Sequence, residues 1–148
     1  MRSYLNQEKY KCTFNTAFPR VIEECKRVKR PGQEGTWLTP ELIECFKELH
    51  IRGYAHSVEV WDQDELVGGV YGIKIGHIFF GESMFHKKAN ASKFGFIHLV
   101  RKLESEGVCL IDCQQQTNHL MSFGAIMISK NKFWNHLRTN WLVALSDK

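Results

Sequence analysis

The sequence has no long hydrophobic run and no segment that resembles a targeting signal. No apolar run approaches the roughly 18 residues that indicate a transmembrane helix, and the first residues open no hydrophobic signal-peptide segment. These two absences argue against a membrane protein and against a secreted one. We therefore expect a cytoplasmic protein without a membrane partner.

Cysteine pairs, metal-ligand spacings and nucleotide-binding loops are also missing. The five cysteines are odd in number and form no CxxC pair, which predicts reduced, buried thiols rather than a disulfide framework. The seven histidines show no HExxH motif or other paired spacing, so no metal site is predicted. No zinc-finger spacing or Walker loop is present, and no cofactor is expected.

What the sequence does contain fits one globular domain. Its 148 residues are 43% apolar and 24% charged, without an internal repeat, a low-complexity stretch or a linker. Residues 1–148 are therefore expected to form a single domain. The net charge is +4, and part of the positive charge gathers near the start of the chain, at Lys9, Lys11, Lys26 and Arg27. Such a cluster can contact phosphates, although a solvated surface also explains it.

Hydrophobic spacing predicts the order helix, helix, three-strand meander, helix, strand, helix, strand, helix. The pair Gly68-Gly69 within the middle strand of the meander indicates a bulge or a close approach of two backbones. This order describes a mixed sheet with helices on its faces, an α+β or α/β layered fold. The predicted helices are 15–29, 40–52, 91–106, 118–123 and 131–138, and the predicted strands are 57–61, 66–75, 77–80, 108–112 and 125–128.

Polar side chains follow two apolar strands, at the point where each strand is predicted to end. Glu82 follows residues 77–80, and Asp112 and Gln114 follow residues 108–111. A carboxylate among apolar groups needs a cation or hydrogen-bond donors, which a cationic substrate, an internal lysine or backbone amides could supply. Asp112 and Gln114 are two apart on the predicted strand, so they share a face and can touch one bound group. They can equally be solvated residues beyond the end of the strand.

Two other readings of the polar residues are weaker. Cys113 and His119 could be a thiol nucleophile and its base, but no third group to orient them is evident and strand alternation turns Cys113 away from Asp112. Trp37, like the other tryptophans, can be a core residue or a platform on which a nucleotide base stacks.

Several ordered blocks of the sequence resemble the bacterial leucyl/phenylalanyl-tRNA-protein transferases, from about Tyr10 to Leu137. His119, Ser122 and Gly124-Ala125 follow these blocks in register. The blocks that carry the resemblance are Glu34–Thr39 (EGTWLT), Ala55–Trp61 (AHSVEVW), Glu65–Gly72 (ELVGGVYG), Gly81–Phe85 (GESMF), Asn90–Lys93 (NASK) and Leu110–Gln114 (LIDCQ).

The resemblance implies a mixed sheet of the GCN5-related N-acetyltransferase type. It also implies that Leu or Phe, and sometimes Met, moves from aminoacyl-tRNA to the α-amino group of proteins that begin with Arg or Lys, marking them for N-end rule degradation. By motif, Asp112 and Gln114 act at the attacking amine, by abstracting a proton or by orienting the nitrogen. The implied substrate-binding residues are Glu82, Ser83, Val70, Leu99 and Leu103. If tRNA is the donor, the basic residues Lys9, Lys11, Lys26 and Arg27 and the aromatic Trp37 are the expected tRNA contacts.

Two departures from the family pattern leave other functions open. Members of the family carry an amino-terminal domain with a W-[WF]-S-P-x-P-R motif, and no part of this chain matches it; the family's tail beyond the last helix is also shortened or altered after Leu137. We therefore expect a short relative or a fragment that lacks this domain. A non-catalytic relative that binds basic protein N-termini is one alternative, and a redirected N-acyltransferase is another. An acetyl-CoA enzyme needs a glycine-containing pyrophosphate loop before the central helix, and residues 86–91 contain no glycine. The oligomeric state is left open.

Overall fold

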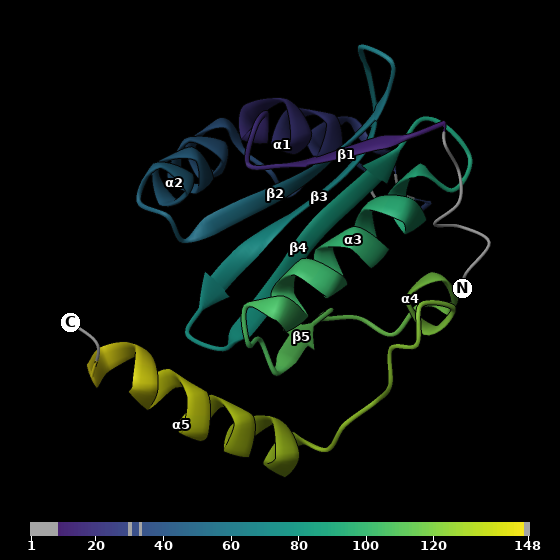
Figure 1. The fold of residues 1–148 in the computed structure, drawn as a ribbon. Coiled ribbons are helices and arrows are strands. Elements are labelled where there is room, and N and C mark those ends of the chain that lie inside the picture. Colours follow the sequence, from purple (N-terminus) through teal and green to yellow (C-terminus); the bar gives the residue numbers. More distant parts are fainter. Residues whose placement is uncertain (1–8, 30, 33, 147–148) are drawn as a thin grey trace.

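One five-stranded sheet organises the molecule, in the spatial order β1-β2-β3-β4-β5. The computed structural model describes residues 9–29, 31–32 and 34–146 (Figure 1). Strands β1 to β4 pair with one another in antiparallel order, whereas β5 runs parallel to β4. The elements, in chain order, are β1 (Lys11–Phe14), α1 (Phe18–Arg27), α2 (Pro40–Ile51), β2 (Ala55–Asp62), β3 (Glu65–Ile75), β4 (Ile78–His86), α3 (Ala91–Ser105), β5 (Leu110–Asp112), α4 (Asn118–Met121) and α5 (Lys130–Ser146).

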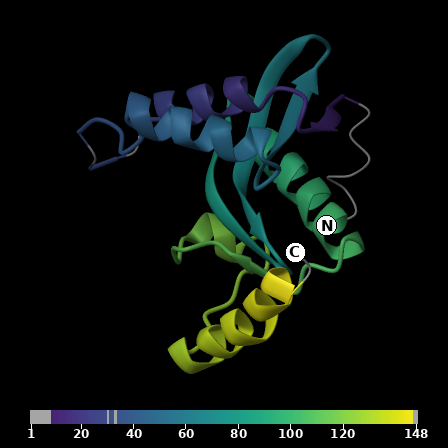
Figure 2. The ribbon, with the colours of Figure 1, turned by 90° about the vertical axis from the view of Figure 1, so that its left-hand side faces the viewer.

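Helices cover both faces of this sheet, so the molecule has three layers. Helices α1 and α2 lie on one face and α3 lies on the other, while α5 extends below the sheet (Figure 2). One core cluster joins α1 and α2 to the sheet through residues such as Phe18, Phe46 and Tyr71. A second cluster joins α3 to the other face through Val70 and Leu99. The strands of the centre are therefore buried on both sides, as a layered fold requires.

Local sequence signals explain where the helices begin. Thr39 caps α2 by accepting a hydrogen bond from the Leu42 amide at 3.2 Å, and Pro40 occupies the first helical position. At the start of α1, the buried Glu59 carboxylate of β2 accepts hydrogen bonds from Ala17 N (3.2 Å) and the Thr16 hydroxyl (2.9 Å). The same carboxylate accepts from the Thr13 hydroxyl at 2.7 Å, which ties β1 to β2. Glu59 thus satisfies the free amide of Ala17 at the helix start.

The mixed layered fold predicted from the sequence is confirmed, with several corrections to its elements. Strand β1 was not predicted, because four residues of mixed polarity show no clear alternation. Strand β4 continues to His86 instead of ending at residue 80, so Glu82 lies inside a strand. The strand predicted for residues 125–128 does not form, and that segment has no sheet partner among the described residues. Gln114 lies beyond the end of β5 and not on it.

The expectation of buried thiols is only partly right. All five cysteines are free, but Cys45 and Cys109 are exposed and only Cys25 is fully buried. Burial, with the nearby Glu59 charge as a second cause, raises the pKa of the half-buried Cys12 thiol to about 12. None of the helices within the described ranges combines the length and the apolar character needed to cross a membrane. Residues 1–8, where the signal-peptide expectation falls, lie outside the described residues.

The glycine pair in β3 marks a close approach, as predicted. A Cβ at Gly68 would lie 2.9 Å from the Ala91 Cβ at the start of α3, and one at Gly69 would lie 2.7 Å from the Phe85 ring. The pairing between β2 and β3 also shifts by one residue beside Gly68, between Val60 and Trp61. Both glycines therefore allow neighbouring elements to pack directly on the sheet.

Candidate active site

The two strands at one edge of the sheet separate and leave an open wedge between them. Strands β4 and β5 pair only from Ile78 with Leu110 to Phe80 with Asp112. Beyond that point β5 ends, whereas β4 continues to His86. The space between β4 and the chain that follows β5 is called the wedge below. It opens the edge of the sheet at the carboxyl end of β5.

A bulge in β4 places Glu82 in the wedge. Tyr71 of β3 pairs with Ser83, but its neighbour Gly72 pairs with Gly81, so Glu82 is an extra residue without a partner on β3. A bulge of this kind bends the strand and redirects the side chain of the extra residue. Because it follows directly after the last pair between β4 and β5, it lies where the two strands part. No pattern in the sequence predicts this bulge.

The structure brings Glu82, Asp112 and Gln114 together. The Gln114 side-chain amide donates a hydrogen bond to the Glu82 carboxylate, with Nε2 and Oε1 3.3 Å apart. The backbone amide of Gln114 donates to Asp112 Oδ1 at 2.8 Å. This second bond accompanies the left-handed backbone of Gln114, whose φ is +63°. Gln114 therefore faces Glu82 because the chain turns sharply, and not because it alternates along a strand.

The pKa of Glu82 is raised above its ordinary value. Burial of the half-buried carboxyl is the main cause, the Gln114 hydrogen bond lowers the pKa, and the negative charge of Asp112 raises it again. No arginine or lysine is among the groups that shift this pKa. The Glu82 carboxyl therefore lies near a second negative charge, that of Asp112, and a bound cation would relieve their repulsion.

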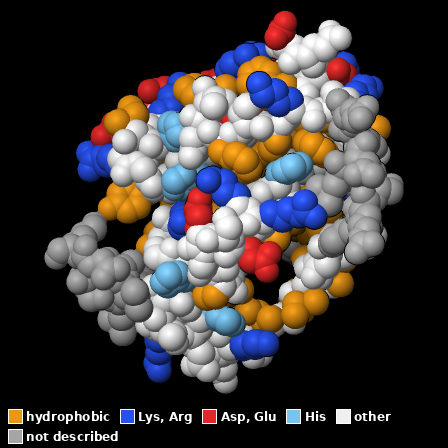
Figure 3. All heavy atoms as spheres, viewed as in Figure 1, with side chains coloured by type: hydrophobic (Ala, Val, Ile, Leu, Met, Phe, Trp, Pro, Cys, Tyr) orange, Lys and Arg blue, Asp and Glu red, His pale blue; other side chains and the backbone are white. Residues whose placement is uncertain are grey.

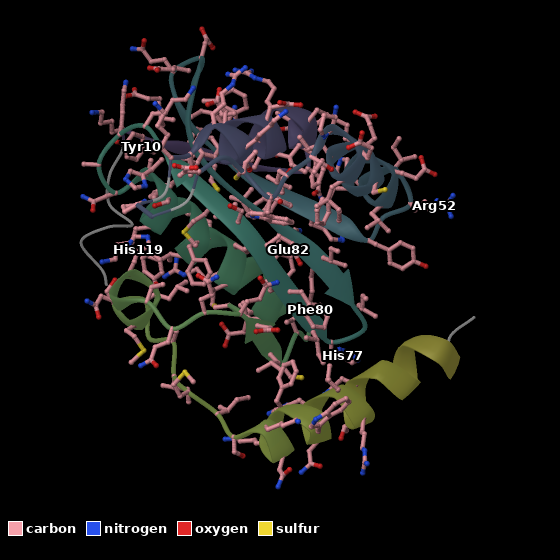
Figure 4. The ribbon with its side chains drawn as sticks, turned by 180° about the vertical axis from the view of Figure 1, so that it is seen from behind. Tyr10, Arg52, His77, Phe80, Glu82 and His119 are labelled. Atoms are coloured by element: carbon pink, nitrogen blue, oxygen red, sulfur yellow. The ribbon has the colours of Figure 1, made fainter. Side chains whose placement is uncertain are left out.

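A cavity of about 530 Å³ fills the wedge and reaches both faces of the sheet. Trp37, from the chain before α2, lines it on one side, and Phe96 of α3 lines it on the other. Figure 4 shows Glu82 on β4 and His119 on α4, which also line the cavity. The remaining lining residues are Val70, Phe79, Gly81, Ser83, Met84, Ile111, Cys113, Gln114, Gln115, Thr117 and Leu120. The cavity thus combines an apolar floor with a polar side at Glu82 and Gln114.

Only one of the three residues predicted to form the apolar pocket lines the cavity. Val70 does so, whereas Leu99 and Leu103 lie in the core cluster with it and are 3% exposed. Phe96 takes their place on the α3 side. Phe96 lies three residues before Leu99 on the same helix, and this spacing alone does not distinguish a core residue from a cavity wall.

Cys113 and His119 both line the cavity, but they do not form an activated pair. Burial and the Asp112 charge raise the pKa of the Cys113 thiol, which disfavours the thiolate. Burial, His86 and Lys93 lower the pKa of His119, which favours the neutral ring. His119 packs edge-on against Phe123, with ring centroids 4.6 Å apart. No described group of three or more His, Cys, Asp or Glu side chains has the arrangement of a metal site.

The basic residues predicted to contact tRNA lie outside the cavity. Lys9 is 3.8 Å from the Asp62 carboxylate, and Arg27 is 3.2 Å from Glu24. Lys11 is exposed on β1 and Lys26 lies in the last turn of α1. Trp37 is the exception, since it lines the cavity, is 43% exposed and packs against Phe46.

The fold defines a class of protein. The structure resembles that of an aminoglycoside acetyltransferase from an uncultured soil metagenomic sample, with a TM-score of 0.60 over 83% of this chain and 93% of that one. The two sequences are only 9% identical, so the likeness concerns the fold alone. The sheet and the helical layers together are those of the GCN5-related N-acetyltransferase fold.

Sequence comparison identifies the family within this class. A protein from Christiangramia forsetii named leucyl/phenylalanyl-tRNA--protein transferase is 57% identical over 93% of this chain, and one of the same name from Pseudomonas syringae pv. tomato is 53% identical over 90%. The family model described as leucyl/phenylalanyl-tRNA protein transferase matches residues 1–138. The chain therefore belongs to this family. It spans 66% of the length of the first relative and 58% of the second.

Proposed function

We propose that this protein transfers Leu or Phe from aminoacyl-tRNA to the α-amino group of proteins that begin with Arg or Lys. The observation that carries the proposal is the wedge, in which an apolar cavity adjoins Glu82, Asp112 and Gln114. The apolar floor suits the transferred side chain, and the carboxyl groups suit a cationic acceptor. Family membership supports the same reaction. In this proposal the new amino-terminal residue marks the acceptor for N-end rule degradation.

The proposed reaction replaces an ester with an amide. The α-amine nitrogen attacks the ester carbonyl carbon, a C–N bond forms, the C–O bond to the terminal ribose of the tRNA breaks, and the amine proton ends on the ribose oxygen. An α-amine has a pKa of about 7.7–8.0, so roughly 10–20% of it is neutral at pH 7. A strong base is therefore unnecessary, and holding the two reactants together supplies most of the acceleration.

Asp112 and Gln114 act on the amine in this proposal. The Gln114 amide oxygen accepts a hydrogen bond from the amine and so directs the lone pair of the amine nitrogen toward the ester carbonyl. The Gln114 Nε2 donates to the Glu82 carboxylate at 3.3 Å, which holds the amide in place. Asp112 stabilises the positive charge that develops on the nitrogen. It also holds Gln114 in place through the backbone bond of 2.8 Å. Glu82 and Ser83, which line the cavity together, hold the basic side chain of the acceptor.

A transfer assay with labelled Leu-tRNA and short peptides tests the proposal. Removal of one partner of a buried charge pair costs roughly 2–5 kcal/mol. Glu82 is only half-buried, so we expect Glu82→Gln to raise the KM for an Arg-initiated peptide about thirtyfold, the equivalent of the lower figure. Glu65→Gln, at a carboxylate outside the cavity, is the matched control. Equal use of Arg-, Lys- and Ala-initiated peptides by the unaltered protein would overturn the assignment.

The second candidate function is binding of basic protein N-termini without transfer. This function keeps the role of Glu82 and needs no donor site. It is favoured by the ion pairs of Lys9 and Arg27, because these pairs occupy two of the side chains expected to contact tRNA. In the assay above it predicts peptide binding that depends on Glu82 with no labelled product. We also propose a cytoplasmic location, because that is where aminoacyl-tRNA and newly made acceptor proteins meet.

A further inference from the structure

A second hollow runs alongside β5 and joins the wedge cavity. It has a volume of about 850 Å³ and lies between the β5–α3 side of the molecule and the segment that leads from α4 to α5. Cys113 and Gln114 line both hollows, so the two are continuous at these residues. Asp112 lines only the second hollow and Glu82 lines only the first. The second hollow is called the β5 groove below, and the proposed chemistry uses only its end at Asp112 and Gln114.

One wall of the β5 groove is the open edge of a strand. Strand β5 is the last strand in the sheet order, and no described strand pairs with its outer edge. Such an edge presents backbone N–H and C=O groups that an extended peptide can pair with. The three residues of β5 extend over about 10 Å, which matches three residues of an added strand.

The opposite wall is apolar and exposed. Ile126 is 74% exposed and Met127 is 68% exposed, values that are high for such side chains and that leave this wall without a cover among the described residues. Figure 3 shows hydrophobic side chains gathered along the segment between α4 and α5, beside a hollow in the surface. Residues 125–128 have the apolar composition for which a strand was predicted, but they pair with no described strand.

The charges in the β5 groove differ between its two ends. Asp112 lies at the end that opens into the wedge. Lys130 and Lys132 line the groove from the first turn of α5, which lies away from the wedge below the sheet (Figure 1). A ligand with a cation at one end and an anionic or neutral body matches this arrangement. The charges therefore favour a peptide whose amino terminus points into the wedge.

We propose that the β5 groove binds residues 2–4 of the acceptor polypeptide as an extended strand on the outer edge of β5. The proposal rests on the proposed function and adds a second part to its acceptor site. The α-amine reaches Asp112 and Gln114 from the groove, and the donor occupies the wedge cavity from the side of Trp37. Acceptor selection then depends on the residues that follow the first one, with acidic residues favoured near Lys130 and Lys132.

Peptide length and backbone chemistry test this assignment without any tRNA. Fluorescence anisotropy measures the affinity of the protein for three labelled peptides that begin with Arg. The first is a dipeptide and the second is a pentapeptide with glutamate at its fourth position. The third is the same pentapeptide with N-methyl groups at its second to fourth positions. We expect the pentapeptide to bind at least tenfold more tightly than the dipeptide. N-methylation removes the donors that pair with β5 and should abolish the gain. Equal affinity of all three peptides would overturn the groove assignment while leaving Arg recognition intact.

Charge reversal locates the far end of the peptide. The double substitution Lys130→Glu and Lys132→Glu should weaken binding of the pentapeptide with glutamate at its fourth position about tenfold, and should strengthen binding of one with lysine there. Lys29→Glu with Arg52→Glu, which makes the same charge change outside the groove, should alter neither. A benzophenone at the fourth position of the peptide should cross-link to residues 121–136. Cross-linking elsewhere would overturn the proposal.

Two further outcomes have distinct meanings. If sedimentation shows a dimer that Lys130→Glu with Lys132→Glu dissociates, the groove is occupied by a second copy and the acceptor assignment is wrong. If no Arg-initiated peptide of any length binds or accepts Leu, the proposed function fails together with the groove. If only the groove assignment is wrong, the dipeptide should still bind, and its binding should still depend on Glu82.

Discussion

At the scale of single residues, Glu82 shows how one extra residue in a strand makes a site. The bulge removes Glu82 from the pairing with β3 and places its carboxyl beside Gln114. Its neighbours in β4, Gly81 and Ser83, are partly buried, and the Glu82 carboxyl is half-buried with them. The raised pKa follows from that burial and from the charge of Asp112.

The raised pKa of Glu82 predicts a pH-dependent stability. In the folded protein this carboxyl binds a proton more readily than in the unfolded chain, where its pKa is about 4.5. The contribution of Glu82 to the free energy of unfolding should therefore fall as the pH rises from 4.5 through the raised pKa. Glu82→Gln removes this fall, so its stability relative to the unaltered protein should increase with pH across that window. Urea denaturation at several pH values measures the difference.

The comparison between the two proteins is needed because other carboxyl groups act in the opposite direction. Hydrogen bonds from Lys88 and from Lys74 hold the pKa values of Asp62 and Glu106 below their usual range. These groups add stability as the pH rises, in both proteins alike. Parallel curves for the unaltered protein and Glu82→Gln would contradict the assignment to Glu82.

Asp112 has two separable roles, and two substitutions distinguish them. Asp112→Asn keeps an oxygen that can accept the Gln114 backbone bond but removes the charge, whereas Asp112→Ala removes both. If the charge stabilises the developing ammonium, both variants should lower kcat about 100-fold, since such groups typically contribute roughly 10²–10⁴-fold. If Asp112 only holds the turn, Asp112→Asn should keep near-normal turnover. The measurement is single-turnover transfer with saturating Leu-tRNA.

At the scale of strands and helices, β3 and β4 make close contacts beside the bulge that carries Glu82. Gly72 and Gly81 are partners directly beside the bulge. A Cβ on Gly72 would clash with the Phe80 carbonyl oxygen and would lie 2.5 Å from the Phe79 ring, whereas a Cβ on Gly81 would meet nothing closer than 3.5 Å. The two glycines differ in their surroundings although they face each other.

This difference predicts unequal effects of two identical substitutions. Gly72→Ala should lower the free energy of unfolding by about 3 kcal/mol, near the upper end for overpacking, because backbone atoms must move. Gly81→Ala should change it by less than about 1 kcal/mol. Thermal and urea denaturation of both variants provide the measurement. Similar losses at the two positions would mean that β3 and β4 do not meet as described.

The sequence predicted the elements with strong periodicity and failed where tertiary contacts decide. Helices α2 and α3 and the meander were predicted because their apolar spacing is a local signal, to which α2 adds its Thr39 cap. Strand β1 was missed because it is defined by its pairing with β2 and by Glu59, a partner 46 residues from Thr13. The bulge at Glu82 depends on the register of β3, and the turn at Gln114 depends on a bond to Asp112. Neither leaves a periodic signal in the sequence.

Tertiary contacts also decide how the residues of the candidate site are arranged. The motif blocks identified Glu82, Asp112 and Gln114, and the structure brings them together through the bulge and the turn. Helix α3 buries Leu99 and Leu103 against the sheet, whereas Phe96, one turn before Leu99, lines the cavity. A helical spacing shows which residues share a face, but it does not show where that face meets a cavity.

At the scale of the whole molecule, the proposed function separates tRNA binding from chemistry. Asp112 and Gln114 lie in the wedge region, whereas Lys11 lies on β1 at the opposite edge of the sheet and Lys26 lies near the end of α1. Among the described residues, ion pairs already occupy Lys9 and Arg27, so Lys11 and Lys26 are the more available contacts for phosphates.

This separation predicts that two kinds of variant change different quantities. Each phosphate contact releases counterions, so Lys11→Gln with Lys26→Gln should reduce the slope of log affinity for Leu-tRNA against log salt by about 1–2. Transfer at saturating Leu-tRNA should be unchanged in that variant. Asp112→Ala should leave the salt slope intact and slow transfer. Lys47→Gln with Arg52→Gln, on and just after α2, is the matched control for lost charge and should leave the slope as it is. Filter binding at several salt concentrations gives the slope. A slope that falls in the Asp112 variant, or stays the same without Lys11 and Lys26, would show that the tRNA is held by residues other than those assigned.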